Sequence, residues 1–269
     1  MSRLSLARAA FALLVLSALC QFTLTSGGDA RMLALAVIVA TSALVASIAG
    51  FAFCALAGTA FAYLRVDPVH SVHTLVVCST AIQLYAVWKI RSAIRWRPLC
   101  PMLLAGAAAV PLGVWLLRHA DSAVYTVGLG ALLAAYGAYT AFRREWRARS
   151  GAAWIDVVAG ALGGLTGGLA GLPGPSVTIW CSMRGWDRLA QRATYQPFIL
   201  VMQVVCVICL HWQDPTAVVT SADLGLIPFA MAGGVAGFAV YQRMTTRQFH
   251  VVISALLVVS GLGLLVRPL

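Results

Sequence analysis

The chain has 269 residues, of which 61% are hydrophobic and 10% are charged, and its mean hydropathy is +0.89. Soluble domains carry about 25% charged residues, so the composition excludes a soluble protein and predicts an integral membrane protein. The net charge of +11 does not indicate nucleic-acid binding, because no basic stripe with interleaved aromatic residues lies outside the apolar runs. Basic residues instead gather in the cytoplasmic loops of membrane proteins.

The N-terminal segment, residues 1–32, has the pattern of a first membrane span. Arg3 and Arg8 precede an apolar run from Ala9 to Leu24. This resembles a signal sequence, but no clear small-x-small cleavage site follows it. We therefore expect an uncleaved first transmembrane span.

The remaining apolar runs predict helices of two kinds. Most are close to the ~20 residues that a membrane-spanning helix needs. Two runs are about 32 residues long, 33–64 and 152–183, and each has a weak centre, at Ala49–Phe53 and Gly171–Pro175. We expect each long run to be a broken or re-entrant helix. The ordinary runs lie at 68–88, 98–117, 122–142, 193–210, 222–241 and 248–266.

The order of these runs repeats. Each long run is followed by three ordinary runs, which predicts two homologous halves, residues 33–149 and 150–269, with the polar stretch Arg143–Gly151 at their junction. Three pairs of identical residues match at an offset of 120 or 121: Gly50 with Gly171, Thr74 with Thr194, and Gln83 with Gln203. Inverted repeats with broken helices are common in transporters.

The distribution of Lys and Arg favours a hairpin for each long run. If each long run crosses the membrane once, the nineteen basic residues divide ten to nine between the two sides. If each long run enters, turns at its weak centre and returns, fifteen lie on one side and only Arg31, Arg65, Arg118 and Arg267 lie on the other. Basic residues are normally in excess on the cytoplasmic side. The hairpin arrangement therefore predicts inverted halves, with Arg149 and Arg184 both cytoplasmic.

Several stretches resemble the TauE/SafE family of sulfite and organic anion exporters. They are Gly50-Phe51-Ala52-Phe53, the segment Val110–Asp121, the glycine-rich GGLTGGLAGLPGPS, and the segment Arg184–Phe198 that contains Arg192-Ala193-Thr194. The resemblance covers about residues 33–267. It implies a permease for sulfur-containing or carboxylated anions. Ala52 and Cys54 stand where the family often has glycines.

The two breaks predict a binding site for a small anion. A half-helix that begins inside the membrane presents unpaired N–H groups and the positive end of its dipole. Pro175 is suited to a first helical position and Gly174 to a close backbone approach, and hydroxyls follow at Ser176 and Thr178. Gly50, Phe51, Phe53 and Gly171 complete the predicted set at the breaks. The alternative is that the small residues only allow tight helix packing.

Polar residues within the spans extend this predicted site. Arg192 begins an apolar span, where it either captures an anion or marks the cytoplasmic end of a helix. Thr194, Gln196 and Gln203 follow it, and Thr74 and Gln83 are the counterparts in the first half. Polar residues in a span usually face the protein interior, where a glutamine either binds substrate or ties two helices together.

Three titratable residues each have two possible roles. His70 and His73 lie near one end of a span, where they either accept a proton that couples transport to a gradient or are interfacial residues. Asp156, the acid in the second long run, is either a proton relay or a cap at a helix start.

These patterns predict a multi-pass permease of the bacterial inner membrane, a secondary carrier with its anion site between the two broken helices. No Walker motif, nucleophile elbow or zinc spacing occurs, so we expect neither an enzyme nor a cofactor. The expected partners are a small anionic substrate, the lipid bilayer and protons as a coupling ion. The alternative function is a structural or assembly subunit of the membrane. The pattern gives no oligomeric state.

Overall fold

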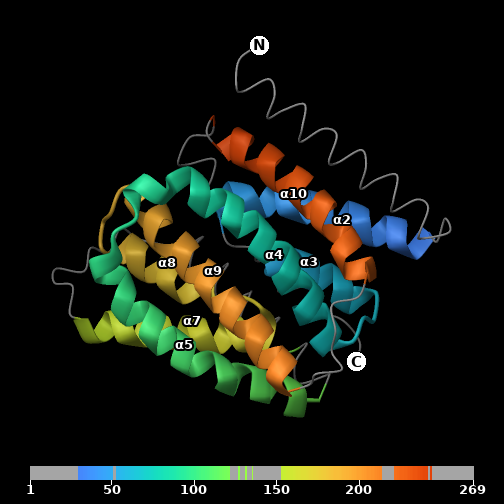
Figure 1. The fold of residues 1–269 in the computed structure, drawn as a ribbon, viewed down its shortest axis with the longest axis horizontal. Coiled ribbons are helices and arrows are strands. Elements are labelled where there is room, and N and C mark those ends of the chain that lie inside the picture. Colours follow the sequence, from blue (N-terminus) through green and yellow to red (C-terminus); the bar gives the residue numbers. More distant parts are fainter. Residues whose placement is uncertain are drawn as a thin grey trace.

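The computed structural model describes residues 30–50, 53–121, 153–213 and 221–241, with positions 127, 131, 135 and 243. This part of the chain is helical and contains no strand (Figure 1). Its helices are α2 (Ala30–Ala49), α3 (Phe53–Tyr63), α4 (Pro68–Ile90), the 3-10 turn η1 (Arg91–Ala93), α5 (Trp96–His119), α7 (Ala153–Ala170), α8 (Gly174–Met183), α9 (Arg188–Gln213) and α10 (Ser221–Tyr241). The predicted first span lies outside the described residues, as do the runs 122–142, apart from isolated positions, and 248–266.

Both long apolar runs break where their weak centres predict. Helix α2 ends one residue before Gly50, and α7 ends one residue before Gly171. The two glycines have φ angles of +87° and +64°, in the left-handed region that a side chain rarely adopts. Each donates its N–H to a carbonyl four residues earlier, Gly50 to Ala46 at 2.7 Å and Gly171 to Gly167 at 2.9 Å. Gly50 and Gly171 therefore end their helices in the same way.

After the second break the chain turns back along itself. Ser176 Oγ on α8 donates to the Ala159 carbonyl of α7 at 2.9 Å, and Trp180 Nε1 donates to Asp156 Oδ1 at 2.5 Å. The Arg184 guanidinium, at the end of α8, also reaches Asp156 at 3.3 Å. Later residues of α8 thus contact earlier residues of α7, so the two helices form an antiparallel hairpin. Asp156, for which the sequence left two readings, ties the open end of this hairpin together.

Two helix pairs pack through glycines, with backbone against backbone. A Cβ atom on Gly160, Gly164 or Gly168 of α7 would meet the carbonyl oxygen of Met102, Gly106 or Val110 of α5. In the same way Gly233 and Gly237 of α10 lie against the carbonyls of Ala40 and Leu44 of α2. Because each step of four residues on one helix matches a step of four on its partner, both pairs run parallel. Small residues that let helices approach closely are typical of packing within membranes.

These contacts determine the direction of α2 in the bundle and show that α3 runs back in the opposite direction. Helix α10 runs parallel to α2, and Asp223 at the start of α10 contacts Thr74 near the start of α4. The starts of α2, α4 and α10 therefore lie at one end of the bundle. Since only the short segment 64–67 joins α3 to α4, α3 leads back to the end at which α2 began.

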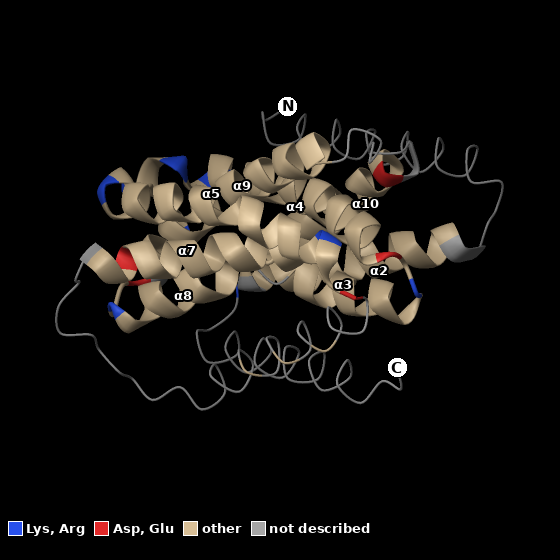
Figure 2. Cartoon of the chain, turned by 90° about the horizontal axis from the view of Figure 1, so that it is seen from below, with Lys and Arg blue, Asp and Glu red and all other residues tan. Residues whose placement is uncertain are grey.

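Helices α4 and α9 lie in the centre of the bundle, between the α2–α10 pair and the α5–α7 pair (Figure 1). Four described helices are long and apolar enough to cross a membrane, namely α4, with η1 included, α5, α9 and α10. Exposed tryptophans stand at helix ends, among them Trp88, Trp96 and Trp212, as in the aromatic belts of membrane proteins. Figure 2 shows Lys and Arg residues, in blue, at the end of the bundle where α5 begins and α8 ends.

The glycine contacts predict where a methyl group is tolerated. A Cβ on Gly164 would collide with the Gly106 carbonyl, which is backbone and cannot move aside, whereas a Cβ on Gly58 would lie an ordinary 3.6 Å from Leu75. We expect Gly164→Ala to separate α5 from α7 and to cost about 1–3 kcal/mol of stability, the usual range for overpacking. Gly58→Ala is the matched control and should melt like the wild type in detergent. Equal melting temperatures for the two variants would contradict the observed packing.

The antiparallel hairpin predicts the side of the membrane on which each end lies. In a background without the seven native cysteines, Arg184→Cys and Arg97→Cys should react with an impermeant thiol reagent from the same side. Arg65→Cys should react from the opposite side, because it joins α3 to the start of α4. Reaction of Arg184→Cys together with Arg65→Cys would exclude the hairpin.

Candidate functional site

A polar pocket lies beside the first break, where five helices of the chain meet. The cavity volume is about 20 Å³, which is room for about one water molecule. The end of α2, the first residue of α3, the middle of α4, the first turns of α9 and the later turns of α10 form its walls. The lining residues are Ala46, Ser47, Gly50, Phe53, Ser79, Ile82, Gln83, Tyr85, Ala86, Arg192, Gln196, Gly234 and Phe238.

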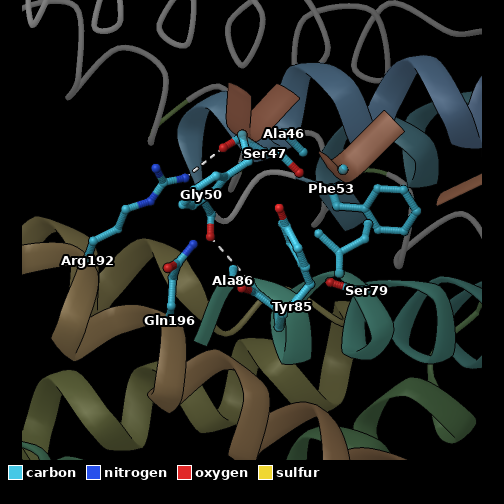
Figure 3. A pocket seen from close by; sticks show the side chains of 13 residues that line it. Ala46, Ser47, Gly50, Phe53, Ser79, Tyr85, Ala86, Arg192 and Gln196 are labelled. Atoms are coloured by element: carbon cyan, nitrogen blue, oxygen red, sulfur yellow. Dashed lines mark hydrogen bonds between the residues drawn. The ribbon is translucent and has the colours of Figure 1, made fainter. Parts of the chain in front are cut away.

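The cation in this pocket is Arg192, which is only 1% exposed. Its Nη2 donates to the Ser47 carbonyl at 2.6 Å (Figure 3). Its guanidinium also lies over the ring of Tyr241, at 3.7 Å from the centroid, and over the ring of Phe238, at 5.2 Å. These contacts fix the guanidinium at the carbonyl end of α2, where the helix dipole is negative.

The contacts of Arg192 leave donors unused. Its Nε and Nη1 atoms are buried and have no hydrogen-bond partner among the described residues. Within the same part of the chain, no carboxylate forms an ion pair with it. A buried charge costs several kcal/mol unless it is paired and hydrogen-bonded. Arg192 therefore leaves two buried nitrogen donors, Nε and Nη1, without an acceptor at this pocket.

Other polar groups of the pocket are also unsatisfied. The hydroxyl of Ser47 and the Oε1 atom of Gln196 are buried without partners among the described residues. Gln83 Nε2 donates to the Gly50 carbonyl at 3.1 Å, which holds the break in position. Helix α3 begins at the pocket wall with Phe53, and the first-turn N–H groups of a helix lack acceptors within it. Apolar side chains of Phe53, Ile82 and Phe238 also line the pocket.

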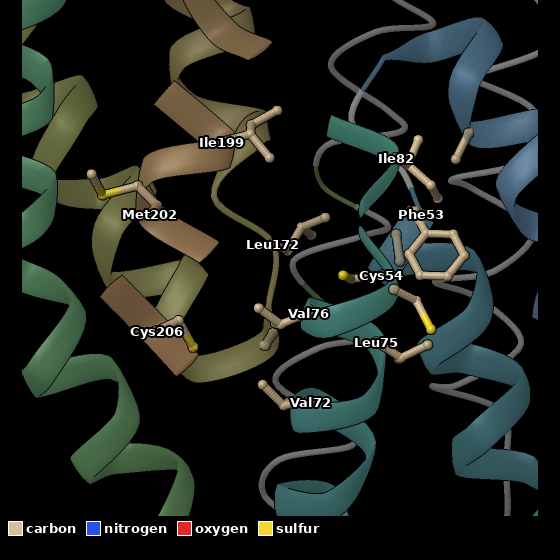
Figure 4. Packing of buried hydrophobic residues seen from close by; sticks show 14 of the residues in the cluster. Phe53, Cys54, Val72, Leu75, Val76, Ile82, Leu172, Ile199, Met202 and Cys206 are labelled. Atoms are coloured by element: carbon tan, nitrogen blue, oxygen red, sulfur yellow. The ribbon is translucent and has the colours of Figure 1, made fainter. Parts of the chain in front are cut away.

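The second break lies in a different environment. A Cβ on Gly171 would lie 2.8 Å from Val76 Cγ2 and 3.4 Å from Cys54 Sγ, so the two breaks meet here through Cys54 of α3. Leu172 is 1% exposed and packs among Val76, Ile199 and other apolar side chains (Figure 4). Its polar backbone is satisfied locally, because Thr166 Oγ1 donates to the Leu172 carbonyl at 2.9 Å. The surroundings of this break are therefore apolar.

The structure brings together part of the residue set predicted from the sequence. Five of its members line the pocket: Gly50, Phe53, Gln83, Arg192 and Gln196. Seven lie elsewhere. Gly171, Gly174 and Pro175 lie at the second break. The other four form hydrogen bonds within the protein: Ser176 donates to Ala159, Thr194 to the Ala190 carbonyl, Gln203 to Ser79 at 2.6 Å, and Thr74 to Asp223. Phe51 lies outside the described residues.

Sequence reasoning missed Ser47, Ser79, Tyr85 and Phe238 as pocket residues. A signal for Ser79 was present, because Ser79 and Gln83 are four residues apart and share one face of α4. Ser47, Tyr85 and Phe238 carry no such signal, since their place beside Arg192 depends on contacts between distant helices.

Long apolar helices, two broken helices and a buried cation in an internal pocket define a multi-spanning helical membrane protein with an interior suited to anions. A family model described as Sulfite exporter TauE/SafE matches residues 33–264. The chain therefore belongs to the TauE/SafE family, whose members are membrane transporters of sulfite or related anions and not enzymes. No curated protein and no solved structure shows significant similarity to the chain.

The two glycines of the breaks allow a matched test of the pocket. A Cβ on Gly50 would lie 2.7 Å from the Tyr195 hydroxyl and 3.2 Å from Arg192 Nε, whereas a Cβ on Gly171 would meet the apolar Val76. Both positions have positive φ, so each Gly→Ala change costs about 1–2 kcal/mol in backbone strain. We expect Gly50→Ala to weaken stabilisation of the purified protein by added sulfite much more than Gly171→Ala does. Equal loss in both variants would contradict a site at the first break.

Proposed function

We propose that this protein is a secondary carrier that binds its anion at the first break, with Arg192 as the main ligand. The observation that carries the proposal is a fully buried guanidinium with two N–H groups left unpaired in a pocket. Hydrogen bonds from a guanidinium to an oxyanion are charge-assisted and about twice as strong as neutral ones. Small oxyanions of sulfur, organic sulfonates and carboxylates all offer suitable acceptors.

The surroundings of Arg192 support reversible binding. Its Nη2 already donates to the Ser47 carbonyl, so the guanidinium has an internal acceptor when no anion is bound. Binding an anion adds acceptors for Nε and Nη1, and the N-terminal end of α3 adds a favourable dipole. The apolar wall of Phe53, Ile82 and Phe238 suits the carbon atoms of an organic sulfonate or carboxylate better than it suits water. A carrier needs such balanced binding, because it must also release the anion.

We place the translocation route between the two breaks, which meet where Gly171 packs on Cys54. Movement of one hairpin relative to the other would expose Gly171, Gly174, Pro175 and Ser176 to the route, with Thr194, Gln203, Thr74 and Phe51 as further contacts. The proposed halves are inverted repeats. Their helix contacts are reciprocal, since α5 of the first half packs on α7 of the second, and α10 of the second packs on α2 of the first. Inverted repeats supply the two equivalent states of alternating access.

The proposal extends to energy coupling and location. Protons are the proposed coupling ion, and the bacterial inner membrane is the proposed location, with the end rich in Lys and Arg on the cytoplasmic side.

The test is Arg192→Gln in purified protein and in proteoliposomes, with sulfite, thiosulfate, sulfoacetate and a simple carboxylate as substrates. Charge-assisted hydrogen bonds contribute about 1.5–3 kcal/mol each, so the dissociation constant should rise about 10- to 100-fold and exchange of labelled anion should fall with it. Arg91→Gln is the control, since Arg91 is an exposed arginine outside the pocket.

Anion exchange by Arg192→Gln at the wild-type rate would remove Arg192 from the site. If the folded wild type binds and exchanges none of the anions in the panel, this would instead favour a structural role, which the sequence left as the alternative.

A further inference from the structure

A buried carboxylate lies at the end of the bundle where α4 and α10 begin, on the side opposite the basic end. Asp223, in the first turn of α10, has a side chain that is 6% exposed. Its Oδ1 accepts a hydrogen bond from Thr74 Oγ1 at 2.6 Å and lies 3.6 Å from His70 Nε2. The His70 side chain is 47% exposed, so one imidazole connects this carboxylate to the surface.

The other groups around Asp223 are titratable as well. His73 is buried on the same helix as His70 and interacts electrostatically with Asp223, His70 and His211 of α9. Cys78 of α4 is also within electrostatic range of Asp223. The ion pair of Asp223 with His70 joins the carboxylate to a histidine. Histidine can gain and lose a proton near neutral pH, whereas arginine in proteins cannot.

We propose that Asp223 is the proton-binding residue that couples anion transport to a pH gradient, with His70 as its relay to water. This inference rests on the proposed carrier function. A proton from water binds the His70 imidazole. It then passes to a carboxylate oxygen of Asp223, where an O–H bond forms as the N–H bond of the imidazolium breaks. Chains of acidic residues and histidines within membrane proteins are typical proton paths.

The position of Asp223 explains how its protonation would reach the anion pocket. The hydrogen bond to Thr74 joins α10 to α4, and the same two helices carry pocket residues, Gln83 on α4 and Phe238 on α10. Gly234, which also lines the pocket, follows Asp223 by eleven residues, or about 16 Å along a helix. Neutralising Asp223 replaces a charge-assisted bond with a weaker neutral one. Helix α10 is then less tightly held to α4, and Phe238 moves relative to Arg192, over which its ring lies.

The experiment compares two modes of transport by Asp223→Asn in proteoliposomes. Net flux of anion is driven by an imposed pH gradient, and exchange of labelled for unlabelled anion is measured at equal pH. We expect Asp223→Asn to lose pH-driven net flux by about tenfold or more, because the ~1.4 kcal/mol that one pH unit supplies corresponds to a factor of ten. Exchange should continue, since it needs no net movement of protons.

Matched variants keep the test decisive. Asp156→Asn removes the other buried carboxylate at a helix start, but that one is paired with Arg184, so its pH-driven flux should match that of the wild type. His70→Gln leaves the Asp223–Thr74 bond in place and should reduce pH-driven flux while exchange persists. Asp223→Glu keeps a titratable carboxylate and should retain much more pH-driven flux than Asp223→Asn does.

The assignment is overturned if Asp223→Asn, or His70→Gln in case Asp223→Asn does not fold, retains the pH-driven flux and pH dependence of the wild type. It is also overturned if folded Asp223→Asn loses exchange together with net flux. Failure of the carrier function itself is distinguishable, since it would abolish exchange in the wild type.

Discussion

The constraint on which the structure depends is that a polypeptide in lipid must satisfy its own backbone. Water is absent from the bilayer core, so every N–H and C=O at a break needs a partner within the protein. Both breaks meet the first part of this requirement in the same way, with a left-handed glycine whose N–H closes the preceding helix, at Gly50 and Gly171. They differ in how the carbonyls at the end of the helix are satisfied, and this difference determines where the polar pocket lies.

The backbone carbonyls of the second break find hydrogen-bond partners within their own hairpin, whereas those of the first break depend on other helices. At the second break, Thr166 of the same hairpin bonds to Leu172, and apolar side chains close the space around it. At the first break, the carbonyls of Ser47 and Gly50 receive bonds from Arg192 and Gln83, which come from α9 and α4. Because polar side chains of other helices satisfy the carbonyls of the first break, the pocket beside this break is polar. The two breaks thus share the geometry of their glycines but differ in the chemistry around them.

Packing between the helices follows the same physical rule. Because lipid is as apolar as a leucine side chain, the hydrophobic effect does not hold helices together in a membrane, and close backbone contact does. The glycines of α7 and α10 provide that contact at carbonyls of α5 and α2. These two tightly packed pairs flank α4 and α9, which carry Gln83, Arg192 and Gln196 of the pocket. The α4–α10 contact also includes Asp223 and Thr74, so one helix interface joins the pocket to a titratable carboxylate at the end of the bundle.

The sequence by itself determined the class of protein, four of the ordinary spans and the position of both breaks. These features depend on local properties, since an apolar run of sufficient length must be helical in lipid and a cluster of glycine and proline interrupts it. It also singled out Arg192, because a cation at the start of an apolar span is rare. Only the tertiary structure decided that Arg192 lies against the first break and not the second, although the second lies within 20 residues of it in the chain. The bond from Arg192 to Ser47 spans 145 residues, and the Thr74–Asp223 bond spans 149. Contacts of that separation arise from how whole helices pack, which no local pattern of residues encodes.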